Sequence, residues 1–310
     1  MIKIISFIVM LLFLGCSYKI NPNEFARVNA KKSKILPSKQ EIYSKIQILI
    51  TTPKQTPPNI QAKSVIESLL SSNNSVIILN RKFNSIEDEI KLAEEAKKSK
   101  TNLNQANYIV KVAITSGNTS TTYHPPVYWR DKKGKIHKTP AYYSHRACIE
   151  GYIKIIKIPE QITSTLPLYN CESENTQSRY YNFDYLINST IKEAILDKKD
   201  DLYEIFAKRG YVFEIRKKDN KTILHTTLGS EFGAKEGEVV NIYTLKVKKE
   251  PFSNKEKIIQ KKIGEGVISD KIEPDSSWII VKKAKEPIKI GDFVKINYHY
   301  SIFDRIKDIF

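Results

Sequence analysis

The sequence predicts an α+β protein in which an α/β domain precedes a small all-β barrel. Between residues 44 and 208, apolar strand-like runs alternate with segments of helical spacing. After Gly210 the helical spacing ends, and six short strand-like runs follow with turn residues between them. The chain of 310 residues is long enough for two domains of ordinary size.

The N-terminus is typical of an exported bacterial lipoprotein. Lys3 precedes an apolar run at 4–14 that is too short to span a bilayer and leads to a small residue, as in a secretory signal peptide covering 1–15. The text FLGC at 13–16 resembles a lipobox, which implies diacylglycerol and palmitate-type chains on Cys16. Several acyl chains on one cysteine anchor a protein stably, and Ser17 favours the periplasmic face of the outer membrane. The alternative is an ordinary cleaved signal with an incidental cysteine.

The charge balance narrows the class of partner. The chain has 51 basic and 34 acidic residues and a formal charge of +17, which suits acidic surfaces such as lipid headgroups and cell-wall polymers. Nucleic acid is a poor partner for an exported protein, and no RNP, helix-turn-helix or zinc-finger pattern occurs in the sequence. We therefore expect no nucleic-acid partner.

The α/β domain at 44–208 follows a polar segment at 16–43, whose lack of a sustained period predicts a lipidated, flexible tether. Asn59 can cap the first helix, and Asn84 or Ser85 can cap the second. The acids of the second helix are expected to form a solvated face with nearby lysines. The third helix can break near Asp200. The predicted strands cover 45–51, 75–81, 107–115 and 147–158, and the predicted helices cover 60–70, 86–100 and 183–208.

Residues 209–300 predict a small barrel or a pair of packed sheets, followed by a tail at 301–310. Gly-x-x-x-Gly-Glu at 233–238 and Ile-Gly-Asp at 290–292 are expected to supply positive-φ positions where strands begin. The six predicted strands cover 211–216, 222–228, 238–247, 262–272, 277–284 and 292–300.

The most unusual composition lies between two predicted strands, in an insertion at 116–146. It is rich in Tyr, Trp, His and Arg, residue types that bury a large area around a polar handle at interface hot spots. We expect this aromatic insertion to bind a partner, and the alternative is a hairpin folded onto its own domain. The run DKKGKIHK at 131–138 and the lack of apolar alternation disfavour a pore-forming hairpin. The candidate partner-binding residues are Tyr123, His124, Tyr128, Trp129, Arg130, Tyr142 and Tyr143.

The remaining thiols, Cys148 and Cys171, are even in number and belong to an oxidising compartment, which predicts a disulfide. It would close a loop of about twenty residues and contribute roughly 3 kcal/mol. Two unpaired buried cysteines are the alternative. The spacing of His124, His137 and His145 is not diagnostic of zinc, so neither a metal nor a cofactor is expected. No GxSxG or HExxH pattern occurs, and no enzymatic activity is expected.

Two stretches of the α/β domain resemble CsgG-like periplasmic lipoproteins. The text SVIILNRKFNSIEDEIKLAEE at 75–95 is similar to the segment in which an apolar strand ends in Arg and leads into a helix that holds a glutamate. NYIVKVAIT at 107–115 is similar to the following strand, with Asn107 where the family usually has aspartate. Over roughly 44–208, this resemblance implies a domain of the anticodon-binding-domain-like kind.

The last hundred residues resemble the C-terminal domain of the FlgT-like flagellar assembly proteins. The similar texts are LG at 228–229, GAKEGEVVNIY at 233–243, IGEGVI at 263–268 and IKIGDFV at 288–294. Such turns also occur in unrelated SH3-like barrels, which is the alternative. FlgT-like proteins join a CsgG-like middle domain to such a barrel, whereas the N-terminal lipid anchor resembles CsgG.

Together these features predict a non-catalytic lipoprotein of the periplasm that acts as a scaffold or assembly factor of an envelope machine. The resemblance implies a flagellar basal-body accessory, such as a ring or disk, with protein partners and a homo-oligomeric state. The alternatives are a CsgG-type secretion channel subunit and a module that binds peptidoglycan.

Overall fold

The computed structural model describes residues 18–99, 105–249 and 256–299 and divides the chain into two compact units. One unit comprises residues 46–203, and the other comprises 1–45 together with 204–310. The first contains a mixed sheet with helices and the second a six-stranded antiparallel barrel, so the predicted α+β class is confirmed. Cys16 and the predicted tail at 301–310 lie outside the described residues. Within the described ranges, no helix is long and apolar enough to cross a membrane.

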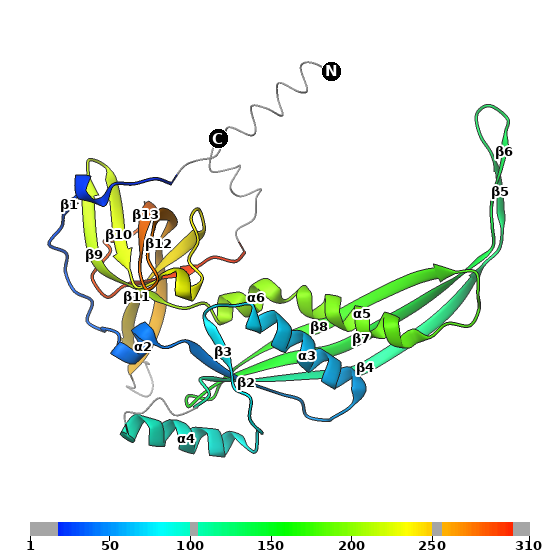
Figure 1. The fold of residues 1–310 in the computed structure, drawn as a ribbon, viewed down its shortest axis with the longest axis horizontal. Coiled ribbons are helices and arrows are strands. Elements are labelled where there is room, and N and C mark those ends of the chain that lie inside the picture. Colours follow the sequence, from blue (N-terminus) through cyan, green and yellow to red (C-terminus); the bar gives the residue numbers. More distant parts are fainter. Residues whose placement is uncertain (1–17, 100–104, 250–255, 300–310) are drawn as a thin grey trace. The chain divides into compact units, whose positions relative to one another are not determined.

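The sheet of the first unit has the strand order β3-β2-β4-β7-β8 (Figure 1). β2 (Ile46–Thr51) lies parallel to β3 (Val76–Ile78) and β4 (Tyr108–His124). β4, β7 (Tyr142–Lys157) and β8 (Ile162–Thr176) are antiparallel to their neighbours. A helix follows β2 and another follows β3 because parallel strands need a crossover, whereas antiparallel strands can follow one another directly.

Three helices pack against this sheet. α3 (Pro57–Ser71) buries an apolar face and packs beside α5 (Phe183–Leu196). α4 (Ile86–Ser99) covers the face of the sheet to which Ile109 of β4 points, because Ala93 and Ile109 belong to one buried cluster. Val110, the next residue of β4, points to the opposite face. The predicted helix at 183–208 is broken a little before the expected position near Asp200. α5 ends at Leu196, and α6 covers Lys199–Ile205.

The predicted cap of the first helix is wrong. Thr56 precedes α3, and Asn59 is buried within it. The Asn59 side chain accepts a hydrogen bond of 2.7 Å from the Ile114 N–H and donates one of 3.1 Å to the Lys54 carbonyl. Asn59 therefore satisfies strand and loop groups instead of a helix end. For α4, Ser85 is the cap, because its hydroxyl accepts a hydrogen bond from a first-turn amide.

The acidic residues of α4 are not all solvated, in contrast to the prediction. Glu89 is only 1% exposed and contacts Arg81 through two hydrogen bonds of 2.5 Å. Arg81 follows β3, so the pair connects the segment after a strand to the first turn of the next helix. A buried carboxylate needs such a partner, and composition alone does not reveal which acid of a helix will have one.

The second unit contains a closed barrel. β9 pairs with β10 on one side and, through the register Tyr211↔Phe293, with β14 on the other. The core is formed by inward-facing aliphatic residues such as Leu224, Ile242 and Ile268. All six predicted strands are present. They are β9 (Gly210–Lys218), β10 (Lys221–Thr226), β11 (Val239–Lys249), β12 (Glu256–Ile272), β13 (Ser277–Ala284) and β14 (Phe293–Ile296), with shorter elements at Pro22–Glu24, Lys39–Tyr43 (α2) and Ser230–Phe232.

The glycine turns of the barrel adopt the predicted backbone conformation. Gly233 and Gly237 have φ of 91° and 81°, and Gly237 lies two residues before β11. Gly291 has φ of 91° and lies two residues before β14. Only glycine reaches this left-handed region at low cost, which explains why the glycine spacing identified both strand entries.

The predicted tether does not fit the described residues after 17, because much of this segment is bound to the barrel. The strand β1 (Ala26–Arg27) pairs with β9, and the Val28 N–H donates to the Ile215 carbonyl at 2.9 Å. The Ile20 N–H also donates to Asp270 Oδ1 at 2.9 Å. Backbone hydrogen bonds fix the segment, and they leave no trace in its polar composition.

Candidate docking site on the hairpin arm

The segment predicted as an insertion is the outer half of a long hairpin. β4 and β7 remain paired from Tyr108↔Lys157 out to His124↔Tyr142, so the strands do not stop where the prediction ended them. Residues 115–123 of β4 are exposed, whereas the inner half of the strand is largely buried. Backbone pairing continues without an apolar pattern because Thr and Tyr favour strands. We call residues 115–124, 142–150 and 169–176 the arm.

A disulfide links two strands of the arm. Cys148 of β7 is directly opposite Cys171 of β8, and the two sulfurs are bonded. This is the pair for which the sequence analysis expects a disulfide. A covalent bond between neighbouring strands restrains the unfolded chain and limits the separation of the strands in the folded arm.

His145 belongs to the interior of the arm. Its side chain is fully buried, with Nδ1 at 3.0 Å from Thr121 Oγ1 and Nε2 at 2.9 Å from Thr176 Oγ1. Its ring stacks on Tyr181 with 4.5 Å between centroids. A hydrogen bond to Glu174, 2.5 Å long, raises the pKa of Tyr181 to about 12. The sequence did not reveal this cluster, because Tyr181 comes from the segment before α5.

Beyond the arm, the chain forms a separate two-stranded ribbon, which we call the tip. It consists of β5 (Val127–Arg130) and β6 (Ile136–Thr139) and forms its own sheet. Prolines at 125, 126 and 140 flank it and cannot donate to a strand ladder, which explains the break from the arm. In the turn, Asp131 Oδ1 accepts hydrogen bonds of 2.9 Å from the amides of Lys133 and Lys135.

The tip exposes apolar and aromatic side chains on both of its faces. Trp129 is opposite His137, and their rings stack at 4.4 Å. Tyr128 is opposite Lys138, whose Nζ lies 5.5 Å from the centroid of the tyrosine ring. Opposite residues share a face and successive residues alternate, so these two pairs lie on different faces. The large apolar and aromatic residues of the tip that are more than half exposed are Val127, Tyr128, Trp129 and Ile136.

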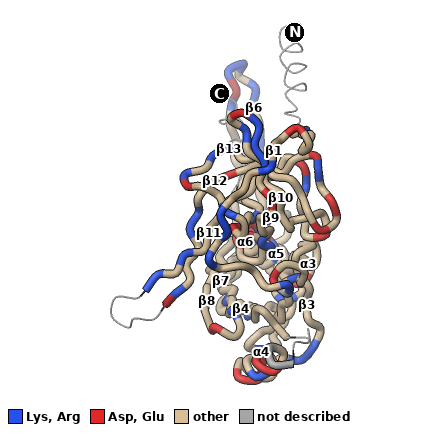
Figure 2. Tube along the Cα trace, turned by 90° about the vertical axis from the view of Figure 1, so that its left-hand side faces the viewer, with Lys and Arg blue, Asp and Glu red and all other residues tan. Residues whose placement is uncertain are grey.

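Positive charge surrounds these exposed side chains. Residues 127–139 contain five basic residues and one acidic residue, a formal charge of +4 (Figure 2). The acid is Asp131, whose Oδ2 lies 3.0 Å from His137 Nε2, and this hydrogen bond keeps the pKa of Asp131 below its ordinary value. Asp131 is therefore ionised and hydrogen-bonded within the turn, and the five basic residues outnumber it.

The candidate partner-binding residues fall into two groups. At the outer end of the arm, the rings of Tyr123 and Tyr143 are tilted to each other with 5.1 Å between centroids, and His124 stacks on Tyr142 at 4.5 Å. The other three lie on the tip and include Trp129. The exposed apolar residues of the tip, Val127 and Ile136, were not among the predicted residues. The alternating texts VYWR and IHKT around a glycine-containing turn are a hairpin signal that could have found them.

The exposed side chains of the tip are suited to binding a partner. The described residues of the arm and the tip do not bring metal ligands together. Among the described residues, no group of three or more His, Cys, Asp or Glu side chains could hold a metal ion. His124, His137 and His145 each make separate contacts. No protein-family model matches the chain, and no curated protein matches it. The geometry of the arm and the tip is thus the main basis for a functional proposal.

Proposed function

We propose that the protein is a non-catalytic lipoprotein, anchored through Cys16 to the periplasmic face of the outer membrane, that docks its tip onto a protein of an envelope machine. It acts there as a scaffold or assembly factor. The sequence resemblance favours the flagellar basal body as that machine. The observation that carries the docking proposal is the two-stranded ribbon with apolar side chains exposed on both faces.

A ribbon of this kind gains stability when a partner covers it. An isolated two-stranded hairpin is marginally stable in water, and the described residues give the tip no third strand. Burying one large apolar side chain contributes about 1.5–3 kcal/mol. Trp, Tyr and Arg are the residue types that dominate binding energy at interfaces, and Tyr128, Trp129 and Arg130 follow one another in the tip.

The charge of the tip indicates the chemistry of the partner. A groove that accepts Trp129 and Tyr128 and carries acidic residues at its rim would complement the formal charge of +4. The arm supports such docking because its disulfide and the buried His145 hold three strands together before the partner arrives. Preorganisation of this kind lowers the entropic cost of binding.

The proposal is tested by complementation of a deletion strain of the native bacterium. The strain receives the wild-type gene, a Tyr128→Ala/Trp129→Ala variant, or a control Ile60→Ala/Tyr185→Ala variant that changes exposed side chains on helices. Swimming motility and in-situ electron tomography of the flagellar motor are compared at equal protein levels. We expect loss of a periplasmic ring or disk in the deletion and tip-variant strains only. Normal motors in the deletion strain would contradict the flagellar assignment, and full rescue by the tip variant would contradict docking through the tip.

A further inference from the structure

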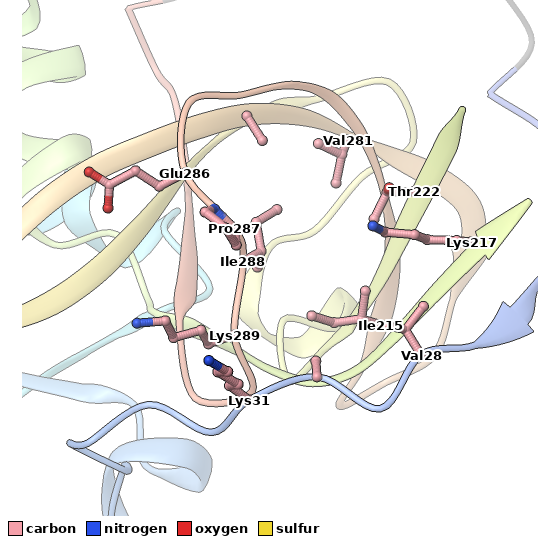
Figure 3. Close-up of a pocket in the computed structure, with 12 residues that line it drawn as sticks. Val28, Lys31, Ile215, Lys217, Thr222, Val281, Glu286, Pro287, Ile288 and Lys289 are labelled. Atoms are coloured by element: carbon pink, nitrogen blue, oxygen red, sulfur yellow. The ribbon is translucent and has the colours of Figure 1, made fainter. Parts of the chain in front are cut away.

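The barrel unit has a pocket of about 600 Å³ that neither the arm nor the tip explains. It lies between the N-terminal segment and the barrel strands, with Val28, Ile215 and Ile288 among its apolar lining residues (Figure 3). Val28 and Ile288 also pack against the buried barrel core, so the lining is continuous with that core. The volume is in the range of ordinary small-molecule sites.

Three lysines line this pocket together with the apolar residues. Lys31, Lys217 and Lys289 are exposed, and within the part of the chain that the structure describes none of them forms a salt bridge. In Figure 3 the Lys217 side chain extends toward the hollow, whereas the Lys289 side chain extends away from it.

The acid in the lining does not neutralise these lysines. The Glu286 carboxylate points away from the hollow in Figure 3 and is bonded to Lys246 at 3.0 Å and to Lys261. The hydrogen bond from Lys261 is the main cause that lowers the pKa of Glu286, and the one from Lys246 adds to it. Glu286 therefore stays ionised and paired outside the pocket. Glu286 is thus not a partner of Lys217.

We propose that the pocket binds a fatty acid, with its alkyl chain against the apolar lining and its carboxylate at Lys217. The lining argues for an alkyl chain, because a sugar or peptide would bury polar groups with few partners there other than Thr222. Lys217 argues for an anionic head, since an ammonium is a point charge suited to a carboxylate. This site is independent of the tip, which belongs to the other unit of the chain.

The test is a titration of full-length protein in phosphatidylcholine nanodiscs with dodecanoate carrying a ¹³C label at its carboxylate, followed by NMR. Empty nanodiscs measure partition into lipid, which does not saturate. We expect one saturable equivalent per protein. Dodecanol has the same chain without the charge, and we expect it to bind about fivefold more weakly in a competition titration.

Variants locate the site. Lys217→Gln should weaken binding about fivefold. Lys289→Gln, at a side chain that extends away from the hollow, and Lys221→Gln, on the same hairpin as Lys217 but outside the lining, should not. Ala284→Trp fills the pocket from an exposed strand end and should abolish binding, with thermal unfolding confirming that the protein is folded. Absence of saturable binding, equal affinity for dodecanol, or unchanged binding by Ala284→Trp would overturn the proposal.

Discussion

Cys148 and Cys171 lie directly opposite each other on β7 and β8 and are joined by a disulfide within the exposed arm. The bond spans a sequence separation of 23 residues. Most side chains of β8 on the arm are exposed or half-buried, so little apolar packing holds this strand to its neighbour. The disulfide therefore replaces part of the stabilisation that a buried core would provide.

Reduction of this disulfide should loosen the arm. On the chain-entropy model a loop of this length contributes about 3 kcal/mol. We expect faster amide hydrogen exchange in peptides covering 169–176 of the reduced wild type and of Cys148→Ala/Cys171→Ala, and unchanged exchange in the barrel. Reductant should have no further effect on the double variant. Equal exchange in the oxidised and reduced protein would show that the bond does not stabilise the arm.

The Arg81–Glu89 pair should matter more than any exposed acid of α4. Replacing Glu89 by alanine leaves the Arg81 guanidinium without its two hydrogen bonds, and we expect the free energy of unfolding to fall by about 3 kcal/mol. Glu94→Ala, an exposed acid on the same helix, should change it by less than about 0.5 kcal/mol. Urea unfolding of both variants measures the difference. Equal losses would mean that the buried pair has no special role.

Acid should weaken the attachment of the N-terminal segment to the barrel. Glu214 Oε1 lies 2.8 Å from Arg27 Nε and 2.6 Å from Arg216 Nε, and the Arg27 hydrogen bond is the main cause that lowers the pKa of Glu214 from 4.5 to about 2. Because the folded pKa is depressed, this stabilisation is present above about pH 4.5 and is lost as the pH falls towards 2. Arg27 is mostly exposed, so we expect only about 1 kcal/mol.

A comparison of wild type with Glu214→Gln isolates this effect from other carboxylates. The variant should be less stable than wild type at pH 6, and the two should converge near pH 2. Thermal unfolding across that range gives the difference at each pH. Two curves that run parallel would rule out a contribution of Glu214 to the pH dependence.

The sequence was most informative where burial or glycine geometry determines the pattern. Apolar runs identified β2 and the barrel strands, and Gly237 and Gly291 identified strand entries through their positive φ. It failed where backbone hydrogen bonds determine the structure. The exposed outer half of β4 and the N-terminal segment along β9 have polar compositions that are equally compatible with loops. Pairings between distant residues, such as Glu89 with Arg81, also leave no periodic signal.

The candidate site was predicted in composition but not in shape. The aromatic residues of the tip were recognised, yet their division between two faces follows from the register of Trp129 with His137 and Tyr128 with Lys138. His145 belongs to the same aromatic-rich segment but is buried. Residue type alone could not separate it from its exposed neighbours, because burial depends on Tyr181 and Thr176 from other segments.

Photo-crosslinking in living cells tests the docking role of the tip most directly. A photoreactive amino acid replaces Val127 on the tip or, as a control, Tyr185 on α5, both exposed. After irradiation, mass spectrometry identifies the crosslinked species. The account predicts a discrete protein adduct from position 127 that is absent from position 185 and is lost when Trp129→Ala is added. Adducts to lipid or peptidoglycan alone, or the same adducts from both positions, would contradict it.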